Sequence, residues 1–220
     1  MLVIFAAALL LCRETAGREA QYKVTASNDV MVTMRDGVRL ATDIYLPAQN
    51  GSRPSERFPI ILTRTPYDKS GSKNSGQYFA SRGYVFVAQD TRGRYRSEGV
   101  WHFLTDDGSD GSDTAKWIEA QPWSNGKIGS MGTSYGGATQ HALALANAPN
   151  LTAMVPVDAM SDYGRYGIRH NGAFELRWFN WVFTLGNATG TRANAAGLSR
   201  SPAGTRHRRS AVECRPRVRR

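Results

Sequence analysis

The stretch KIGSMGTSYGGA, residues 127–138, decides the expected fold. Its first six residues have the apolar pattern of a short strand, and the segment that continues from its second half to Ala146 has the alanine-rich composition of a helix. Between them, Gly132 to Gly136 match the pattern G-x-S-x-G, which is typical of a sharp strand-to-helix turn that exposes a serine hydroxyl. The sequence therefore predicts a strand, a tight turn at Ser134 and a helix, in that order.

Ser134 is the predicted nucleophile, because such a turn lifts the serine hydroxyl above the sheet. Small residues are expected at Gly132, Gly136 and Gly137, since a side chain there would collide with the neighbouring strand or helix. The backbone N–H of Tyr135, at the start of the helix, is the predicted first donor of an oxyanion hole. The bare pattern also occurs by chance, and the alternative is a structural serine in a glycine-rich turn.

Alternating strand and helix patterns surround this stretch. The expected strands are 30–34, 38–46, 59–63, 84–88, 127–132 and 151–157, and the expected helices are 77–82, 110–120 and 135–146. The first two strands flank the hairpin signal Asp36-Gly37, and the later ones alternate with helices as in a doubly wound, mostly parallel α/β sheet. The apolar run 151–157 has the composition of a buried strand, although 155–157 would become an exposed edge if no further strand followed. An amphipathic helix is expected over 174–183.

The positive charge of the chain is concentrated at its carboxyl end. The net charge is +10, yet nine of the 28 basic residues and one of the 18 acidic residues lie in 187–220, which leaves the rest nearly neutral. Residues 187–220 contain no Phe, Trp or Tyr, so we expect an arginine-rich tail that is disordered or aberrantly coded. The alternative is an arm for nucleic acid, but no aromatic residue is present there to stack on bases, and no nucleic-acid partner is predicted.

The first residues have the pattern of an export signal. The apolar run from Leu2 to Leu11 has the length of a signal-peptide core and is too short to span a bilayer. Residues 1–20 are therefore a predicted signal peptide, the expected location is secreted or periplasmic with the cytoplasm as the alternative, and no stable membrane span is expected. The two cysteines, Cys12 and Cys214, lie outside the predicted domain and form no CxxC pair, and no metal and no cofactor are predicted.

Four motifs in a fixed order resemble one family. They are RTPYDK at 64–69, QDTRG at 89–93, WSNGKIG at 123–129 and GTSYGG at 132–137. Together they resemble the CocE/NonD family, which includes X-prolyl dipeptidyl-peptidase-like acyl esterases. The resemblance implies the α/β-hydrolase fold, with 24–162 as the N-terminal part of the catalytic domain and 163–186 as the start of a helical cap.

The resemblance also implies roles for single residues. The hydroxyl of Tyr67, in the loop after an early strand, would be the second oxyanion donor, and the alternative is a packed aromatic residue. Asp68, Asp90 and Arg92 match family positions. We interpret them as structural groups that tie loops together near the site.

A serine nucleophile needs an imidazole base and a carboxylate that orients it, and in this fold both follow the serine in the chain. His141 lies seven residues along the expected helix, about 10 Å from Ser134 by rise, which is too far for a hydrogen bond. His170, His207 and Asp158 are weak candidates. The resemblance implies that the acid, the base, the last strands of the sheet and a C-terminal β-sandwich lie beyond the chain, which would then be an N-terminal fragment.

The expected function is that of a serine hydrolase that attacks a small acyl ester or a peptide through a Ser134 acyl-enzyme. The alternative is a catalytically incomplete fragment or pseudoenzyme that lacks the acid and the histidine of the triad. Expressed by itself, the chain is expected to be poorly soluble and to hydrolyse esters little.

Overall fold

A computed structural model describes residues 18–49, 51, 54–160, 162 and 169–181. Its strands are β1 (Lys23–Thr33), β2 (Arg39–Ala48), β3 (Phe58–Thr65), β4 (Val85–Asp90), β5 (Ser124–Thr133), β6 (Leu151–Val157), β7 (Arg169–His170) and β8 (Ala173–Phe174). Its helices are α2 (Lys73–Ala80), α3 (Asp107–Glu119) and α4 (Tyr135–Leu145), with 3-10 turns at Lys69–Ser72 and Leu176–Trp178. No helix in these ranges has the length and apolar character needed to cross a membrane. Most of the predicted signal segment and the whole of 187–220 lie outside the described residues.

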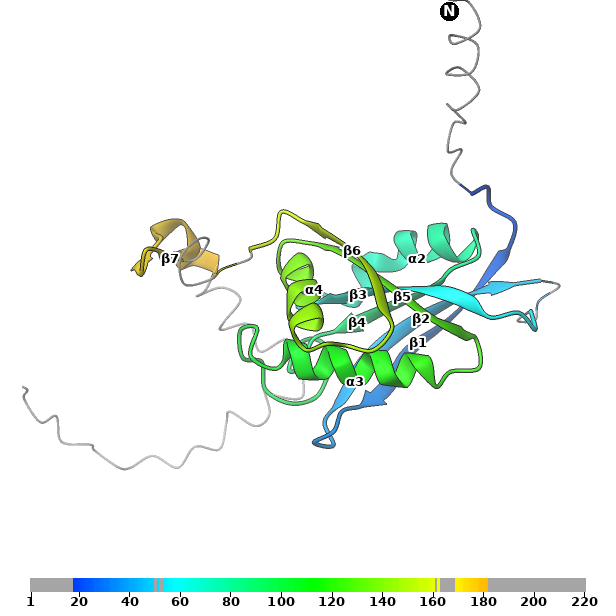
Figure 1. The fold of residues 1–220 in the computed structure, drawn as a ribbon, viewed down its shortest axis with the longest axis horizontal. Coiled ribbons are helices and arrows are strands. Elements are labelled where there is room, and N and C mark those ends of the chain that lie inside the picture. Colours follow the sequence, from blue (N-terminus) through cyan, green and yellow to red (C-terminus); the bar gives the residue numbers. More distant parts are fainter. Residues whose placement is uncertain (1–17, 50, 52–53, 161, 163–168, 182–220) are drawn as a thin grey trace, which may run out of the picture.

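A six-stranded sheet in the order β1-β2-β4-β3-β5-β6 forms the centre of the fold (Figure 1). β2 pairs antiparallel with both β1 and β4, whereas β4, β3, β5 and β6 run parallel. The predicted hairpin at Asp36-Gly37 is confirmed, because Gly37 has a φ of 86° and the Met34 N–H donates to the Val38 carbonyl at 2.8 Å. The mostly parallel α/β sheet predicted from the sequence is confirmed as well.

Helices cover both faces of this sheet, α3 and α4 on one side and α2 on the other (Figure 1). The core on the α3 and α4 side contains Ile44, Phe58, Ile60, Leu62, Val85, Val87, Ala115, Ile118, Trp123, Ile128 and Leu143. The core on the α2 side contains Tyr45, Ala80, Phe86 and Ala88. Successive side chains of β4 thus enter opposite cores, which explains why this strand is a continuous apolar run in the sequence.

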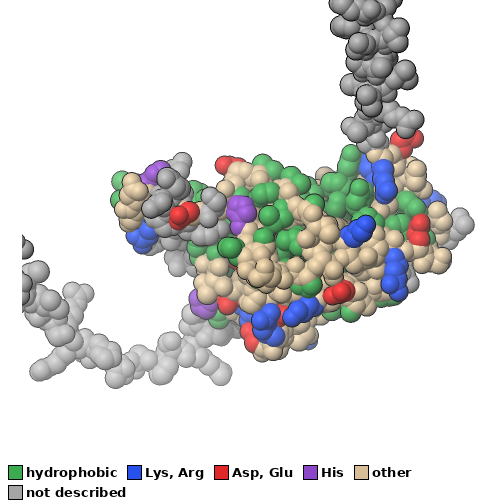
Figure 2. Space-filling model, viewed as in Figure 1, with side chains coloured by type: hydrophobic (Ala, Val, Ile, Leu, Met, Phe, Trp, Pro, Cys, Tyr) green, Lys and Arg blue, Asp and Glu red, His purple; other side chains and the backbone are tan. Residues whose placement is uncertain are grey.

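β6 lies at the edge of the sheet and its outer surface is exposed. The side chains from Thr152 to Val157 are exposed, so the buried position expected from their composition is wrong, whereas the exposed edge expected at 155–157 is confirmed. The reason is that no other described strand pairs with the outer side of β6. Figure 2 shows hydrophobic side chains gathered between α4 and α2, on the face where β6 runs.

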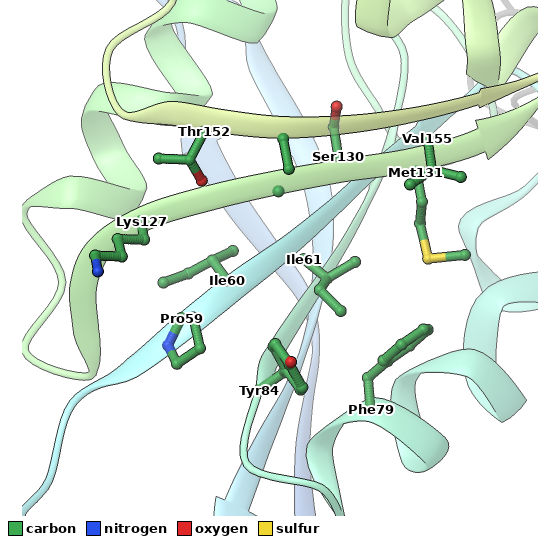
Figure 3. A pocket seen from close by; sticks show the side chains of 12 residues that line it. Pro59, Ile60, Ile61, Phe79, Tyr84, Lys127, Ser130, Met131, Thr152 and Val155 are labelled. Atoms are coloured by element: carbon green, nitrogen blue, oxygen red, sulfur yellow. The ribbon is translucent and has the colours of Figure 1, made fainter. Parts of the chain in front are cut away.

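An apolar groove of about 460 Å³ opens on the α2 side of the sheet next to β6 (Figure 3). Side chains of α2 and of three parallel strands line it, among them Phe79, Ile61, Met131 and Val155. Ser134 is not among the lining residues. The groove is therefore distinct from the strand-to-helix turn and belongs to the apolar surface that β6 leaves uncovered.

The segment expected to be a helix over 174–183 is not one continuous helix. Phe174 lies in β8, which pairs antiparallel with β7, and a 3-10 turn follows at Leu176–Trp178. Asn171 and Gly172 separate the two short strands with φ values of 48° and 89°, the backbone that an Asn-Gly hairpin turn requires. The aromatic spacing that favoured a helix therefore begins in a hairpin, and 182–183 lie outside the described residues. The first expected helix also differs, since α2 begins at Lys73 and not at Gln77.

The exposed edge at β6 predicts self-association that an added charge should reduce. Val155 is 57% exposed on β6, and Leu145 is 84% exposed on α4. Val155→Lys is expected to raise the soluble fraction and to shift the purified chain toward the monomer in size-exclusion chromatography, because a lysine on an edge strand opposes pairing with another chain. Leu145→Lys is the matched control and is expected to change neither. A fully monomeric wild type, or an equal effect of both variants, would contradict the edge-strand explanation.

Candidate active site

Ser134 lies at the junction of β5 and α4. Its backbone has a φ of 57° and a ψ of −119°, a conformation that a residue with a side chain rarely adopts. The Ser134 N–H donates to the Val157 carbonyl of β6 at 2.9 Å, and the Ser134 carbonyl accepts from the N–H groups of Gly137 and Ala138 at 2.9 and 3.0 Å. The neighbouring strand and the following helix therefore hold this strained residue in place.

The strand and the helix pass so close at this turn that two of the glycines have no room for a side chain. A Cβ on Gly132 would lie 2.7 Å from the Gly136 carbonyl oxygen, and a Cβ on Gly137 would lie 2.5 Å from the Cβ of Ala159. A Cβ on Gly136 would meet only the Arg64 carbonyl oxygen, at 3.4 Å, which is an ordinary contact. Close packing thus requires glycine at 132 and 137, whereas position 136 has room for a methyl group.

The N–H of Tyr135 and the side chain of Tyr67 lie next to this turn. The first bonds within α4 are those donated by Gly137 and Ala138, so the Tyr135 N–H is not used by the helix itself. The Tyr67 ring lies 6.4 Å from the Tyr135 ring and nearly perpendicular to it, and Tyr67 is 38% exposed. The structure thus places the Tyr67 ring against the ring of the residue that follows Ser134, and the oxyanion roles of Tyr67 and of the Tyr135 N–H stay predictions.

Two carboxylates hold the loop that carries Tyr67. Asp90, at the end of β4, accepts from the backbone N–H of Lys69 at 2.8 Å and from that of Arg96 at 3.4 Å. Asp68 accepts from the Ser70 N–H at 2.9 Å, at the start of the 3-10 turn. Burial raises the pKa of Asp90 from 3.8 to about 6, although the two N–H groups act in the opposite direction. Both carboxylates therefore have the structural role expected from the sequence.

Ion pairs join the remaining loops to this framework. The Arg92 guanidinium donates to Asp36 in the hairpin turn and to Asp110 in α3, at 2.7 and 2.6 Å, which confirms its structural interpretation. Lys69 is buried, and its ammonium nitrogen lies 2.8 Å from a carboxylate oxygen of Asp43 on β2. These pairs fix the hairpin relative to α3 and the loop after β3 relative to β2.

A buried polar network behind the turn was not predicted from the sequence. The Tyr135 hydroxyl donates to the Asp107 carboxylate at 2.7 Å, and the Arg64 guanidinium donates to the Asp107 carbonyl at 2.6 Å. Arg64 is 2% exposed although it lies in a largely apolar strand. A signal was present, because an arginine in an apolar run and acidic residues in the first turn of a helix together indicate a buried ion pair.

One amide group joins the three elements around the turn. Gln140 of α4 is 2% exposed, and its Oε1 accepts from the Ser130 hydroxyl at 3.1 Å and from the Val155 N–H at 3.0 Å. Its Nε2 donates to the carbonyls of Gly136 and Val155, both at 3.2 Å. The Gln140 side chain therefore makes the hydrogen bonds that join β5, α4 and β6 at the point where they meet. An alanine-rich helix gave no sign of this role.

The described histidines are engaged with other groups. His141 Nδ1 lies 3.1 Å from a backbone carbonyl, and His102 and His170 pair with carboxylates. Within the described ranges no imidazole is hydrogen-bonded to Ser134, and no group of three His, Cys, Asp or Glu side chains could hold a metal ion. His207 lies outside these ranges.

Comparison with known proteins identifies the family of the chain. The X-Pro dipeptidyl-peptidase (S15) family matches residues 36–216. The chain belongs to this family. The match includes most of the arginine-rich segment 187–220, whose structure is outside the described part of the chain.

Relatives in this family include esterases. The cocaine esterase of Rhodococcus sp. (strain MB1 Bresler) is 40% identical over 147 residues, which are 64% of this chain and 25% of the esterase. The structure of an α-amino acid ester hydrolase matches 78% of this chain and 32% of its own with a TM-score of 0.62 and 30% identity. A CocE/NonD family hydrolase from Staphylococcus aureus, 24% identical, has the same fold with a TM-score of 0.65 over 80% of this chain and 36% of its own. The CocE/NonD resemblance and the α/β-hydrolase fold are confirmed, and the chain spans only a quarter to about a third of these relatives.

The close approach at the turn predicts that alanine lowers the stability of the fold at position 132 but not at position 136. Gly132→Ala is expected to lower the free energy of unfolding by roughly 2–3 kcal/mol, because the methyl group would overlap the Gly136 carbonyl. Gly136→Ala is the matched control and is expected to leave stability unchanged or to raise it by up to about 1 kcal/mol, since alanine favours a helix over glycine. Urea unfolding followed by circular dichroism measures both. A Gly132→Ala midpoint equal to that of the wild type would contradict the close approach.

The raised pKa of Asp90 predicts a loss of stability as the pH rises. The folded chain binds this proton more tightly than the unfolded chain, whose pKa is near 3.8, so the stability from protonated Asp90 is complete below pH 3.8 and is lost as the pH rises through about 6. Between pH 4 and pH 7 the wild type is expected to lose about 2 kcal/mol of unfolding free energy relative to Asp90→Asn. Urea titrations of both proteins at several pH values measure the difference.

Asp113→Asn is the control for this experiment, because its pH dependence of stability should have the opposite sign. The hydrogen bond from Arg35 lowers the pKa of Asp113, so its contribution is present above the unfolded pKa and is lost as the pH falls. The wild type should therefore lose stability relative to Asp113→Asn at acid pH. Parallel pH profiles for the wild type and Asp90→Asn would contradict the assignment of Asp90.

Proposed function

We propose that the intact protein is a serine hydrolase that cleaves an acyl ester or a peptide bond through an acyl-enzyme on Ser134. The observation that carries this proposal is the strained backbone of Ser134, with a φ of 57°, between a parallel strand and a helix. Strain of this kind costs of order 1–3 kcal/mol and is enriched at active sites. Membership of the S15 family and the position of Tyr67 beside Tyr135 support the same reaction class.

The proposed reaction uses the turn to stabilise a developing negative charge. The Ser134 hydroxyl oxygen attacks the carbonyl carbon while its proton passes to a general base, and the carbonyl oxygen becomes an oxyanion. The Tyr135 N–H and the Tyr67 hydroxyl would donate to this oxyanion. Collapse of the intermediate expels the alcohol or amine, which takes the proton, and a water molecule then releases the acyl group by the same steps. The base we propose is an imidazole oriented by a carboxylate, both from residues outside those described.

An ester is the first candidate substrate class. The relatives at 40% and 30% identity are a cocaine esterase and an α-amino acid ester hydrolase. An X-Pro peptide is the second candidate, because the family is described by that activity. The acyl-enzyme is common to both classes, which differ in the leaving group. We further propose that residues 1–20 direct export and that 163–186 begin a cap.

A fluorophosphonate probe tests the nucleophile, because it modifies only an activated serine. The intact protein is expected to incorporate the probe at Ser134, as mapped by tandem mass spectrometry, and its Ser134→Ala variant is expected to incorporate none. Ser27→Ala, at an exposed serine of β1, is the matched control and should be labelled like the wild type. Labelling at another serine would contradict the assignment, and no labelling would favour the catalytically incomplete fragment.

The second oxyanion donor is tested by removing one oxygen atom. Tyr67→Phe is expected to lower the rate constant of probe labelling by about 10²-fold, because one donor to the oxyanion is lost while the ring remains. Tyr78→Phe, at a tyrosine of α2 that is 51% exposed, is the matched control. An unchanged rate for Tyr67→Phe would assign Tyr67 to packing, which is the alternative named above.

A further inference from the structure

The Tyr135 side chain lies directly behind the turn, and its hydroxyl uses its full capacity for hydrogen bonds. It donates to the Asp107 carboxylate at 2.7 Å and accepts from the Leu104 N–H at 2.9 Å and from Trp101 Nε1 at 3.2 Å. A phenol has one donor proton and two acceptor positions, so all three are occupied. Packing would need only the ring, which is buried to 2% exposure, whereas three polar partners fix its orientation.

Asp107, which accepts this hydrogen bond, also contacts Arg64. Arg64 Nη1 donates to the Asp107 carbonyl at 2.6 Å and lies 3.5 Å from the Asp107 carboxylate. Arg64 Nε donates to Gln89 Oε1 at 2.9 Å. Burial raises the pKa of Asp107, while the Arg64 charge and the Tyr135 hydroxyl act in the opposite direction. The network thus joins β3, β4 and α3 to the first residue of α4.

The other two partners of the hydroxyl belong to the loop 101–104. Leu104 has a φ of 52°, a left-handed backbone that is strained for leucine, and its N–H is the group bound by the Tyr135 hydroxyl. The rings of Trp101 and Phe103 lie 6.1 and 5.5 Å from the Tyr135 ring. Trp181 packs on both, at 6.4 and 5.6 Å. The loop therefore forms an aromatic wall beside Tyr135.

We propose that the Tyr135 hydroxyl is a positioning group for the candidate site. Through Asp107 and Arg64 it fixes the residue that supplies the backbone N–H next to Ser134, and through Leu104 it holds the loop 101–104 in its strained turn. The effect on catalysis rests on the proposed function. The effect on the loop does not depend on it.

Hydrogen exchange tests the hold on the loop without any need for activity. In Tyr135→Phe the Leu104 amide loses its acceptor, and its exchange rate, measured by NMR under native conditions, is expected to rise by about tenfold or more. Tyr45→Phe is the matched control, because Tyr45 is a buried tyrosine that packs on Phe86 in the core on the α2 side. An unchanged Leu104 rate in Tyr135→Phe would overturn the proposal.

Probe labelling tests the effect on the serine. The rate constant for Tyr135→Phe is expected to fall by about tenfold at a temperature well below unfolding, and that for Tyr45→Phe to stay unchanged. Asp107→Ala should have the same effect as Tyr135→Phe, and the double variant should be little slower than either single variant, because Asp107 acts through the hydroxyl. Additive losses, or a lower unfolding midpoint with normal labelling, would assign the network to stability and overturn the proposal. A wild type that is not labelled would contradict the proposed function, and the Leu104 exchange rate would still decide the hold on the loop.

Discussion

The close approach of β5 to α4 is the constraint on which the candidate site depends. The chain can turn from strand to helix at Ser134 only because Gly132 leaves the Gly136 carbonyl free to lie against the strand. The turn forces Ser134 into a φ of 57°, and this strain is offset by the bond that its N–H donates to the Val157 carbonyl and by the bonds that its carbonyl accepts from the first turn of the helix. The first N–H groups of α4, which the helix itself does not use, follow directly after Ser134 in the chain. The strained turn at Ser134 thus follows from small residues at the crossing and from a parallel neighbour strand.

Buried charges place the surrounding loops more than they stabilise the fold. Removing a charge from water costs several kcal/mol, which a partner offsets only when the geometry is good. Burial raises the pKa of Asp90 to about 6, although the backbone N–H groups of Lys69 and Arg96 that hold it act in the opposite direction. Arg64, in contrast, lies beside Asp107. Asp90 binds the loop that carries Tyr67, and Asp107 binds the Tyr135 hydroxyl, which in turn accepts from Trp101, so both carboxylates help to place loops.

Features marked by local patterns could be predicted from the sequence, and features that depend on distant partners could not. The turn at Ser134 and the hairpin at Asp36-Gly37 rest on a few adjacent residues, and the buried strands rest on continuous apolar runs. The bond from Tyr135 to Asp107 joins residues 28 apart, and the local signals of a buried ion pair at Arg64 and Asp107 do not indicate that a tyrosine belongs to it. The hairpin at Asn171-Gly172 had a local signal, but the aromatic spacing after it favoured a helix. The exposure of β6 could not be predicted from its apolar composition, because the exposure of a strand depends on which other elements pack on it.

The central claim is that the residues around position 134 form an oxyanion hole. A crystal structure of the protein with a phosphonate bound covalently to Ser134 tests it most directly, because the phosphonyl oxygen occupies the position of the oxyanion. We expect that oxygen to lie about 2.7–3.1 Å from both the Tyr135 backbone nitrogen and the Tyr67 hydroxyl. A phosphonyl oxygen that points to solvent, or one bound by neither tyrosine, would contradict the account.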